Sequence, residues 1–202
     1  MYSNPTIVAI VVAVLAIVAV ALLLTRRNKT CSLRRRFGNE YDRTVTERGS
    51  EIEAQAVLEQ RKKRVTHLNI RRLSPTECDH YADAWRVVQS RFVEDPKGAL
   101  IDADDTVISV MKAEGYPMSD FAQRMPDLYF AQRAADLSVD HPDVVQNYRA
   151  AHEIAIRHRE GRATREDLRR AMICYRCLLE DLLNGRSRMD SERLHNGGTK
   201  TN

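Results

Sequence analysis

The sequence predicts an all-α protein in which one N-terminal transmembrane helix precedes a soluble bundle of amphipathic helices. Two observations lead to this prediction. An uninterrupted apolar segment lies near the N-terminus, and beyond it apolar residues recur at steps of three and four between helix-capping signals. No segment alternates polar and apolar residues with the period of two that is typical of strands, so we expect no sheet.

The apolar segment runs from Ile7 to Leu24 and consists of 18 consecutive Ile, Val, Ala and Leu residues. As a helix it would be about 27 Å long, which roughly matches the hydrocarbon core of a bilayer. The alternative is a cleaved signal peptide, which would begin with a basic region and end at a small-residue cleavage site. No Lys or Arg occurs from Met1 to Thr6, and the segment continues past Ala21 into three leucines. We therefore expect a transmembrane helix.

Six basic residues follow the apolar segment: Arg26, Arg27, Lys29, Arg34, Arg35 and Arg36. Positively charged flanks stay on the cytoplasmic side of a membrane. We therefore expect a single-pass protein of the cell membrane, with residues 1–6 outside, residues 7–24 in the bilayer and residues 25–36 as a basic juxtamembrane segment. Specific recognition of anionic lipids by this segment is a second interpretation.

The net charge of +4 could indicate a protein that binds nucleic acid. Without the six residues of the juxtamembrane segment, however, 26 Lys and Arg stand against 28 Asp and Glu, so the remaining chain has a net charge of about −2. The basic run from Arg61 to Arg64 is more typical of a solvated helix end than of a nucleic-acid site. We therefore expect no nucleic-acid partner.

Residues 37–185 are long enough for one compact cytoplasmic domain. The charged segment over residues 50–67 is expected to form a long solvated helix that holds this domain away from the bilayer. The next helix should begin at Ser74, which combines an N-cap serine with a following proline and a capping-box glutamate. Its apolar stripe needs a partner surface and consists of Cys78, Tyr81, Trp85, Val88 and Phe92.

Three further helices are expected. One opens at Pro96 and stops at Gly115, with these residues turned inward: Ile101, Val107, Ile108 and Met111. Another begins at His141-Pro142, and the last begins after Thr164, where an N-cap hydroxyl is followed by acidic residues. Only a few residues separate these two helices, which predicts an antiparallel hairpin. The polar residues 186–202 are predicted to be disordered.

Several motifs identify the chain further. They are the segment from Arg35 to Val45, Arg72-Leu73-Ser74-Pro75, the segment from Trp85 to Pro96, Gly115-Tyr116-Pro117 and the segment from Ala134 to Pro142. In these motifs the chain resembles a family of uncharacterised bacterial proteins that are often labelled simply membrane or secreted protein. The likeness covers residues 33–183. It implies an N-terminal apolar segment and a helical remainder, and it implies no activity and no catalytic residues.

The chain departs from this family pattern at two places. Asn39 stands where the resemblance implies a proline, which relaxes a constraint on the backbone. The element from Phe121 to Arg124 is repeated from Phe130 to Arg133, whereas the family pattern contains it once. Nine added residues within a helix would turn the part beyond them by about 180°. Because Pro126 lies between the copies, a loop is the expected location.

Candidate interaction residues are charged and aromatic side chains near the expected helix ends: Tyr41, Asp42, Arg43, Trp85, Asp136, Asp140, His141 and Tyr148. Asp140 and His141 could form a general acid–base pair, or one of them could cap a helix whose first turn contains Pro142. The charged run that ends at Arg43 could bind a partner or form ion pairs with a neighbouring helix.

No sequence pattern indicates catalysis, a cofactor or a metal. Cys174 and Cys177 have the spacing of a zinc or redox pair, but no second pair or histidine arrangement completes such a site. We therefore expect no cofactor, no metal and no enzymatic activity. The sequence therefore favours a membrane-tethered interaction or scaffold domain. Its expected partners are the lipid bilayer and either another protein or a second copy of this chain. The alternative is an enzyme with a membrane-proximal substrate and a site near Asp140 and His141.

Overall fold

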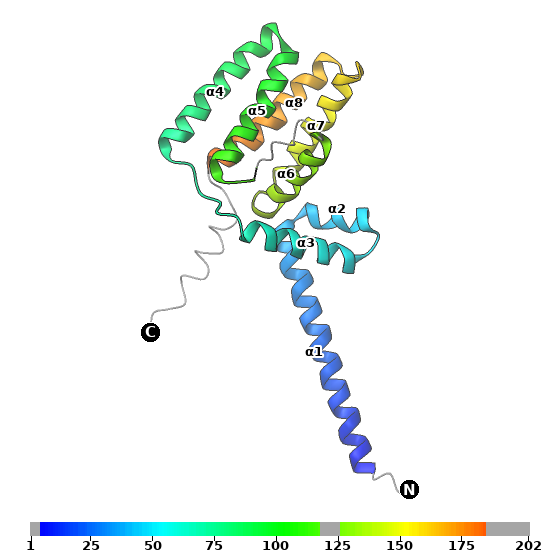
Figure 1. Ribbon diagram of the computed structural model, residues 1–202. Helices are drawn as coiled ribbons and strands as arrows, with labels where there is room; N and C mark the ends of the chain where they lie inside the picture. Colours follow the sequence, from blue (N-terminus) through cyan, green and yellow to red (C-terminus); the bar gives the residue numbers. More distant parts are fainter. Residues whose placement is uncertain (1–4, 118–125, 185–202) are drawn as a thin grey trace.

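The computed structural model of the protein describes residues 5–117 and 126–184. Every regular element in these residues is an α-helix, from α1 to α8, and none is a strand, as the sequence predicts (Figure 1). Residues 1–4, the first copy of the repeated element and the tail over residues 186–202 lie outside the described residues.

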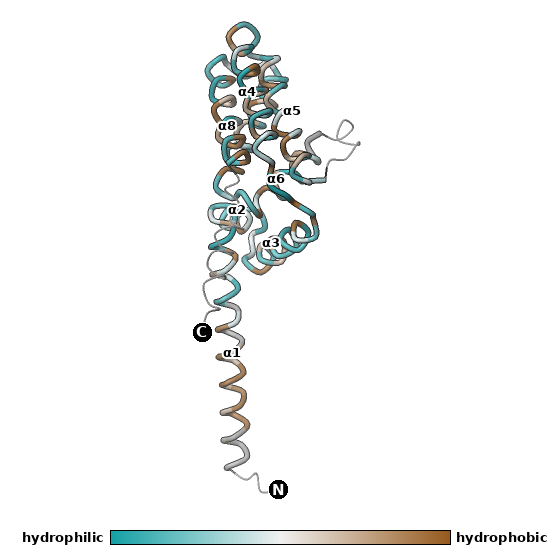
Figure 2. Tube along the Cα trace, turned by 90° about the vertical axis from the view of Figure 1, so that its left-hand side faces the viewer, coloured by the Kyte–Doolittle hydropathy of each residue, from teal (hydrophilic) through white to brown (hydrophobic). Residues whose placement is uncertain are grey.

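The first helix, α1 (Pro5–Phe37), runs without interruption through the apolar segment and the basic segment that follows it. Its N-terminal part extends away from the rest of the molecule (Figure 1). Hydropathy colouring shows that the coloured turns of this projecting part are mostly apolar (Figure 2). Its described side chains, at positions 9, 11–21 and 24, are all exposed. Only the last turns join the domain, where Leu33 is 2% exposed and Phe37 is fully buried.

The segment from Ile7 to Leu24 is helical, as the sequence predicts. In the part of the chain that the structure describes, however, no helix combines the length and the apolar character that crossing a membrane requires. The transmembrane assignment therefore stays a prediction.

Two short helices form a hairpin at the end of α1: α2 (Asn39–Arg48) and α3 (Glu51–Thr66). Gly38 and Gly49, which precede and follow α2, have φ values of 51° and 69°. Glycine adopts these values most readily, so both turns are local consequences of the sequence. Asn39 is the first residue of α2, a position where proline is also favourable. The departure from the family pattern at this position is therefore compatible with the helix.

The segment predicted as a solvated spacer is a packed helix instead. Ala54 and Leu58 of α3 are fully buried, and Val65 is 5% exposed. Leu58 and Val65 join a small apolar cluster with Leu33, Phe37, Tyr41 and Val139. The prediction was wrong because a small residue such as Ala54 permits close approach to a neighbouring helix although it adds little hydrophobicity.

The remaining helices form a bundle above this hairpin: α4 (Pro75–Glu94), α5 (Pro96–Glu114), α6 (Pro126–Asp140), α7 (Val145–Arg159) and α8 (Arg165–Leu183). The α4–α5 and α7–α8 pairs each pack along their length, and α5 packs against α8. The Ser74 hydroxyl caps α4, and the Thr164 hydroxyl caps α8. Both capping predictions and the predicted α7–α8 hairpin are confirmed.

Two expectations about the bundle need correction. Val107 and Met111 are fully buried as predicted, but Ile101 is 65% exposed and Ile108 is only half-buried. The buried stripe of α5 contains Ala103 and Val110 in their place. The second copy of the repeated element, from Phe130 to Arg133, lies within α6, whereas the first copy lies outside the described residues, so the loop location of the insertion stays a prediction. The helix expected at His141-Pro142 begins at Val145, with Val144 as its N-cap.

Candidate functional site

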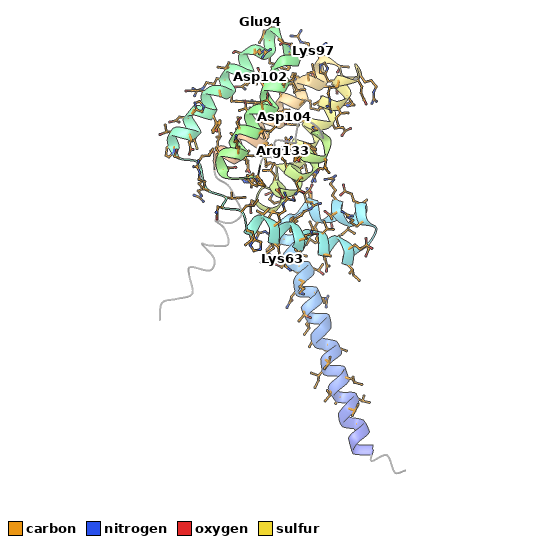
Figure 3. All side chains as sticks on the ribbon, in the orientation of Figure 1. Lys63, Glu94, Lys97, Asp102, Asp104 and Arg133 are labelled. Atoms are coloured by element: carbon orange, nitrogen blue, oxygen red, sulfur yellow. The ribbon has the colours of Figure 1, made fainter. Side chains whose placement is uncertain are left out.

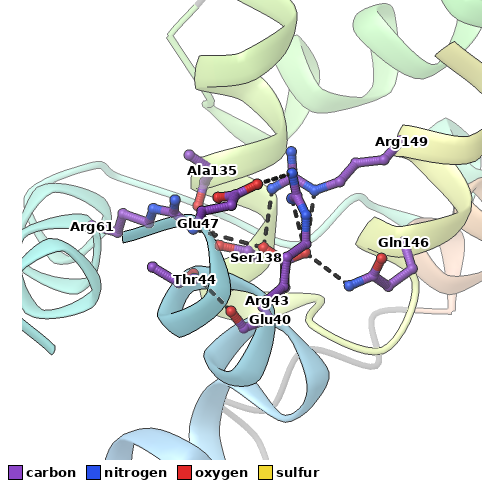
Figure 4. A network of polar contacts seen from close by, with 9 residues as sticks. All are labelled: Glu40, Arg43, Thr44, Glu47, Arg61, Ala135, Ser138, Gln146 and Arg149. Carbon is purple, nitrogen blue, oxygen red and sulfur yellow. Dashed lines mark hydrogen bonds and ion pairs between the residues drawn. The ribbon is translucent and has the colours of Figure 1, made fainter. Parts of the chain in front are cut away.

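A fully buried carboxylate, Glu40, joins the α2–α3 hairpin to the bundle (Figure 4). Arg149 of α7 donates from Nε to Oε1 at 3.2 Å and from Nη2 to Oε2 at 3.0 Å. Gln146 donates to Oε1 at 3.0 Å, and Nη1 of Arg61 in α3 lies 3.7 Å from Oε2. Two-point pairing of Arg with a carboxylate is a strong, directional interaction, and here it compensates for the loss of hydration.

Two carboxylates of α6 pair with basic residues of α1 and α3. Nη2 of Arg36 lies 3.4 Å from Oδ1 of Asp140, and Nη2 of Arg64 lies 3.1 Å from Oδ2 of Asp136. Burial raises the pKa of both aspartates, and the partner arginines oppose this effect. At Asp140, the charge of His141 also opposes it. The last turns of α1, which carry the predicted juxtamembrane charges, are therefore tied to the bundle.

A further group of ionisable side chains lies where α5, α6 and α8 meet. Nδ1 of His141 lies 2.6 Å from Oδ2 of Asp181. Glu114 is 5% exposed, and its Oε2 has no hydrogen-bond partner. Burial raises the pKa of Glu114 to about 7; His141 lowers it, whereas Asp140 and Asp181 raise it. Glu114 is therefore a buried group that titrates near neutral pH.

Most of the predicted site residues are part of the interior. Tyr41 and Tyr148 are fully buried, Trp85 is 7% exposed, and Asp136, Asp140 and His141 are 2–5% exposed. Tyr41 accepts a hydrogen bond from Gln55 at 3.2 Å.

The charged run in α2 forms ion pairs within the protein. Asp42 pairs with Arg34 at 2.7 Å, while Arg43 lies beside Glu47 and 3.5 Å from Glu40. This is the structural alternative of the two that the sequence left open.

A polar network inside the bundle involves the repeated element. Arg133, from its second copy, donates to the Tyr148 hydroxyl at 3.0 Å, and the Tyr175 hydroxyl donates to Asp104 at 3.3 Å. Figure 3 places Asp104 and Arg133 close together between α5 and α6, and their charged atoms are 4.0 Å apart. Burial raises the pKa of Asp104, and Arg133 opposes this effect. The network stabilises helix packing.

A surface groove of about 150 Å³ lies between α4 and α8. Trp85 and Phe92 of α4 face Met172 and Ile173 of α8, and the rim carries Gln89, Arg169 and Arg176. The indole Nε1 of Trp85 is buried and has no hydrogen-bond acceptor. Ile173 is 37% exposed. The groove therefore combines apolar walls and a basic rim.

The geometry offers little to support acid–base chemistry at Asp140 and His141. Both side chains are buried and engaged with Arg36 and Asp181, respectively, and the α4–α8 groove includes neither of them. In the described ranges, no three His, Cys, Asp or Glu side chains are grouped so that they could hold a metal ion.

Comparisons of the chain with protein-family models, curated proteins and solved structures find no match. The molecule's own residues are therefore the basis for a functional proposal.

Proposed function

We propose that the protein is a membrane-tethered helical domain that holds a protein partner, or a second copy, at the cytoplasmic face of the cell membrane. One observation carries this proposal. A single helix, α1, has an apolar part whose described side chains are exposed at one end and residues buried in a folded domain at the other. Exposure of a Val, Leu or Ile side chain to water costs about 1.5–3 kcal/mol compared with burial, so a long apolar helix in water is unfavourable. A bilayer would remove that cost.

The joint between α1 and the domain supports this arrangement. Leu33 and Phe37 are buried, and Arg36 reaches Asp140. One turn earlier, Thr30 accepts a hydrogen bond from Gln55 of α3 at 2.8 Å. Because these contacts extend over two turns of α1, the orientation of the domain follows the orientation of the helix. The basic residues after Leu24 favour a domain on the cytoplasmic side.

The α4–α8 groove is the surface where we place the partner. Arg169 and Arg176 on its rim pair with exposed Glu166 and Glu180 of the same helix. Such surface pairs contribute at most about 1 kcal/mol, so a partner's carboxylates could replace them at low cost. The fitting partner segment presents an apolar side chain to Ile173 and carboxylates to the two arginines.

Extraction of membranes at alkaline pH tests the tether. We expect the full chain to stay with the bilayer, and the double variant Val14→Arg/Ile17→Arg to be released, because two charges in the apolar segment oppose insertion. Val87→Arg/Val93→Arg, which adds the same charges on exposed positions of α4, is the matched control and should be retained. Release of the unchanged protein would refute the tether. Reporter fusions at the two termini test the orientation, and an external C-terminus would refute it.

Photo-crosslinking in cells tests the partner surface. A photoreactive residue at Ile173 should give a discrete adduct, whereas one at Ile101, exposed on α5, should not. Addition of Arg169→Glu and Arg176→Glu should abolish the adduct at position 173, because the rim then repels carboxylates. An adduct that is insensitive to these charges, or equal adducts at both positions, would remove the groove from the proposal.

A further inference from the structure

The unbroken helix α1 sets how far the domain can lie from a bilayer. From Leu24, the end of the apolar segment, to Thr30, which contacts α3, the chain advances six residues. At 1.5 Å per residue this is about 9 Å along the helix axis, and tilting of the helix would only shorten the height. The interfacial layer of a bilayer is about 5–8 Å thick on each side. With no linker between them, α3 would therefore lie at the outer edge of the headgroup layer, where its exposed side chains can reach the headgroups.

The face of α3 that points away from the domain has a suitable composition. Ala54, Leu58 and Val65 are buried, and the opposite side of the helix carries exposed Ile52, Ala56, Gln60 and Lys63. Ile52 is 75% exposed. Figure 3 shows Lys63 at the edge of the domain from which the apolar part of α1 projects. We name these four residues of α3, together with exposed Arg27 and Lys29 of α1, the base surface.

We propose that the base surface rests on the headgroups of an anionic bilayer, with Lys63, Arg27 and Lys29 near the lipid phosphates and Ile52 at the boundary with the acyl chains. This inference depends on the tether proposed above. Three cations lie within about one Debye length of the lipid surface, where attraction to anionic lipid is only partly screened. An exposed isoleucine beside them is typical of helices that lie in the interface.

The three acidic residues of α3, which include Glu59 one turn before Lys63, are outnumbered by its four basic residues, Arg61, Lys62, Lys63 and Arg64. Glu51 and Glu53 lie in the first turn, at the opposite end of the helix from Lys63. Glu51 is near Arg34, whose pKa is raised chiefly by Asp42 and to a smaller extent by Glu51. Contact through the base surface would fix the domain against the bilayer, with the α4–α5 turn farthest away, as the labels Glu94 and Lys97 in Figure 3 indicate.

Fluorescence quenching of the full chain in vesicles tests this contact. The vesicles contain phosphatidylglycerol, phosphatidylcholine and a lipid with a nitroxide on its headgroup. Ile52→Trp should be quenched several-fold more strongly than Val93→Trp, a matched control that is 71% exposed beside Glu94. The native Trp85 is buried in both proteins and contributes the same background. Both substitutions are at exposed positions, and circular dichroism checks that the fold is unchanged.

The possible outcomes separate this inference from the tether. If Ile52→Trp is quenched no more than Val93→Trp while the protein resists alkaline extraction, the headgroup contact is wrong and the tether stands. If the protein is extracted, the proposed function itself fails.

A charge variant isolates the electrostatic part of the contact. Lys63→Glu should weaken the quenching of Ile52→Trp in anionic vesicles, whereas Lys97→Glu should leave it unchanged. Equal quenching in these two variants would refute the role of Lys63.

Discussion

The base of the molecule, α1 to α3, and the α4–α8 bundle are held together by different interactions. The bundle has a large apolar core to which all five helices contribute. The base has a small apolar cluster and relies on buried or half-buried ion pairs to α6 and α7, centred on Glu40, Asp136 and Asp140. Apolar packing is insensitive to salt and pH, whereas ion pairs respond to both. The attachment of the base should therefore be the part of the fold that conditions can change.

The largest effect is expected from Glu40→Ala. This substitution leaves Arg149 and Arg61 half-buried without the carboxylate that they share. Removal of one partner of a buried ion pair costs about 3–5 kcal/mol, and urea unfolding of the detergent-solubilised full chain measures the loss. Glu47→Ala removes an exposed carboxylate two turns away in the same helix and should cost less than about 1 kcal/mol. Equal effects of the two substitutions would contradict the central role of Glu40.

A change in the core of the bundle provides the contrasting case. Leu178 of α8 is fully buried. Leu178→Ala should cost about 2–5 kcal/mol through lost burial and a cavity, and added salt should not change that loss. The loss from Glu40→Ala should, by contrast, depend on salt. If salt affects both variants alike, the distinction between the two regions is wrong.

The pH dependence of stability should reveal Glu114, which lies near the contact between base and bundle. Its pKa is about 7 in the folded protein, whereas an unperturbed glutamate side chain has a pKa of 4.5. The folded protein thus holds this proton more tightly, so the contribution of Glu114 to the free energy of unfolding falls as pH rises from about 4.5 to about 7. The full difference corresponds to about 3 kcal/mol.

Glu114→Gln should therefore stabilise the protein at about pH 8 and have little effect at about pH 4.5, which urea unfolding at the two pH values can measure. Asp104, Asp136 and Asp140 are unchanged in both proteins, so the difference between variant and parent isolates Glu114. A variant that is equally stable relative to the parent at both pH values would show that Glu114 does not titrate in this range.

The smallest effect is expected at a helix cap. The Ser74 hydroxyl accepts a hydrogen bond from the backbone N–H of Glu77 at 3.3 Å, and Glu77 accepts one from the Ser74 backbone at 2.8 Å. Ser74→Ala should cost about 1 kcal/mol, measured as a shift in the urea midpoint. Because the cap is exposed and local, Ser74→Asp should restore most of the loss. A loss that Asp does not restore would point to a tertiary role instead.

Features that depend on a few neighbouring residues could be predicted from the sequence. The caps at Ser74 and Thr164 and the stop at Gly115 are of this kind, because each signal lies within one turn of its effect. Which face of a helix is buried is harder to predict when its apolar residues do not form one clear stripe. In α5 the apolar residues allow two faces, and the packing against α4 and α8 decides that Ile101 lies outside.

The contacts that hold the base could not be predicted. Glu40 and Arg149 are separated by 109 residues, and nothing in either local sequence selects the other from the many Glu and Arg residues of the chain. The groove was predictable in part, because the stripe with Trp85 and Phe92 needs a partner surface, but its second wall depends on how α8 packs. Asp140 and His141 were expected to begin a helix because of Pro142, yet α6 continues through Asp140 and the proline lies in the turn.

Because α1 continues unbroken into the domain, the number of residues after Leu24 sets the direction in which the α4–α8 groove faces as well as the distance of the domain from the bilayer. One residue added between Leu24 and Asn28 would raise the domain by about 1.5 Å and rotate the α4–α8 groove by about 100° around the helix axis. Removal of one residue would rotate it the opposite way. Insertions and deletions in this short segment of α1 could thus turn the groove toward protein partners at different positions in the membrane plane, without any change in the groove itself.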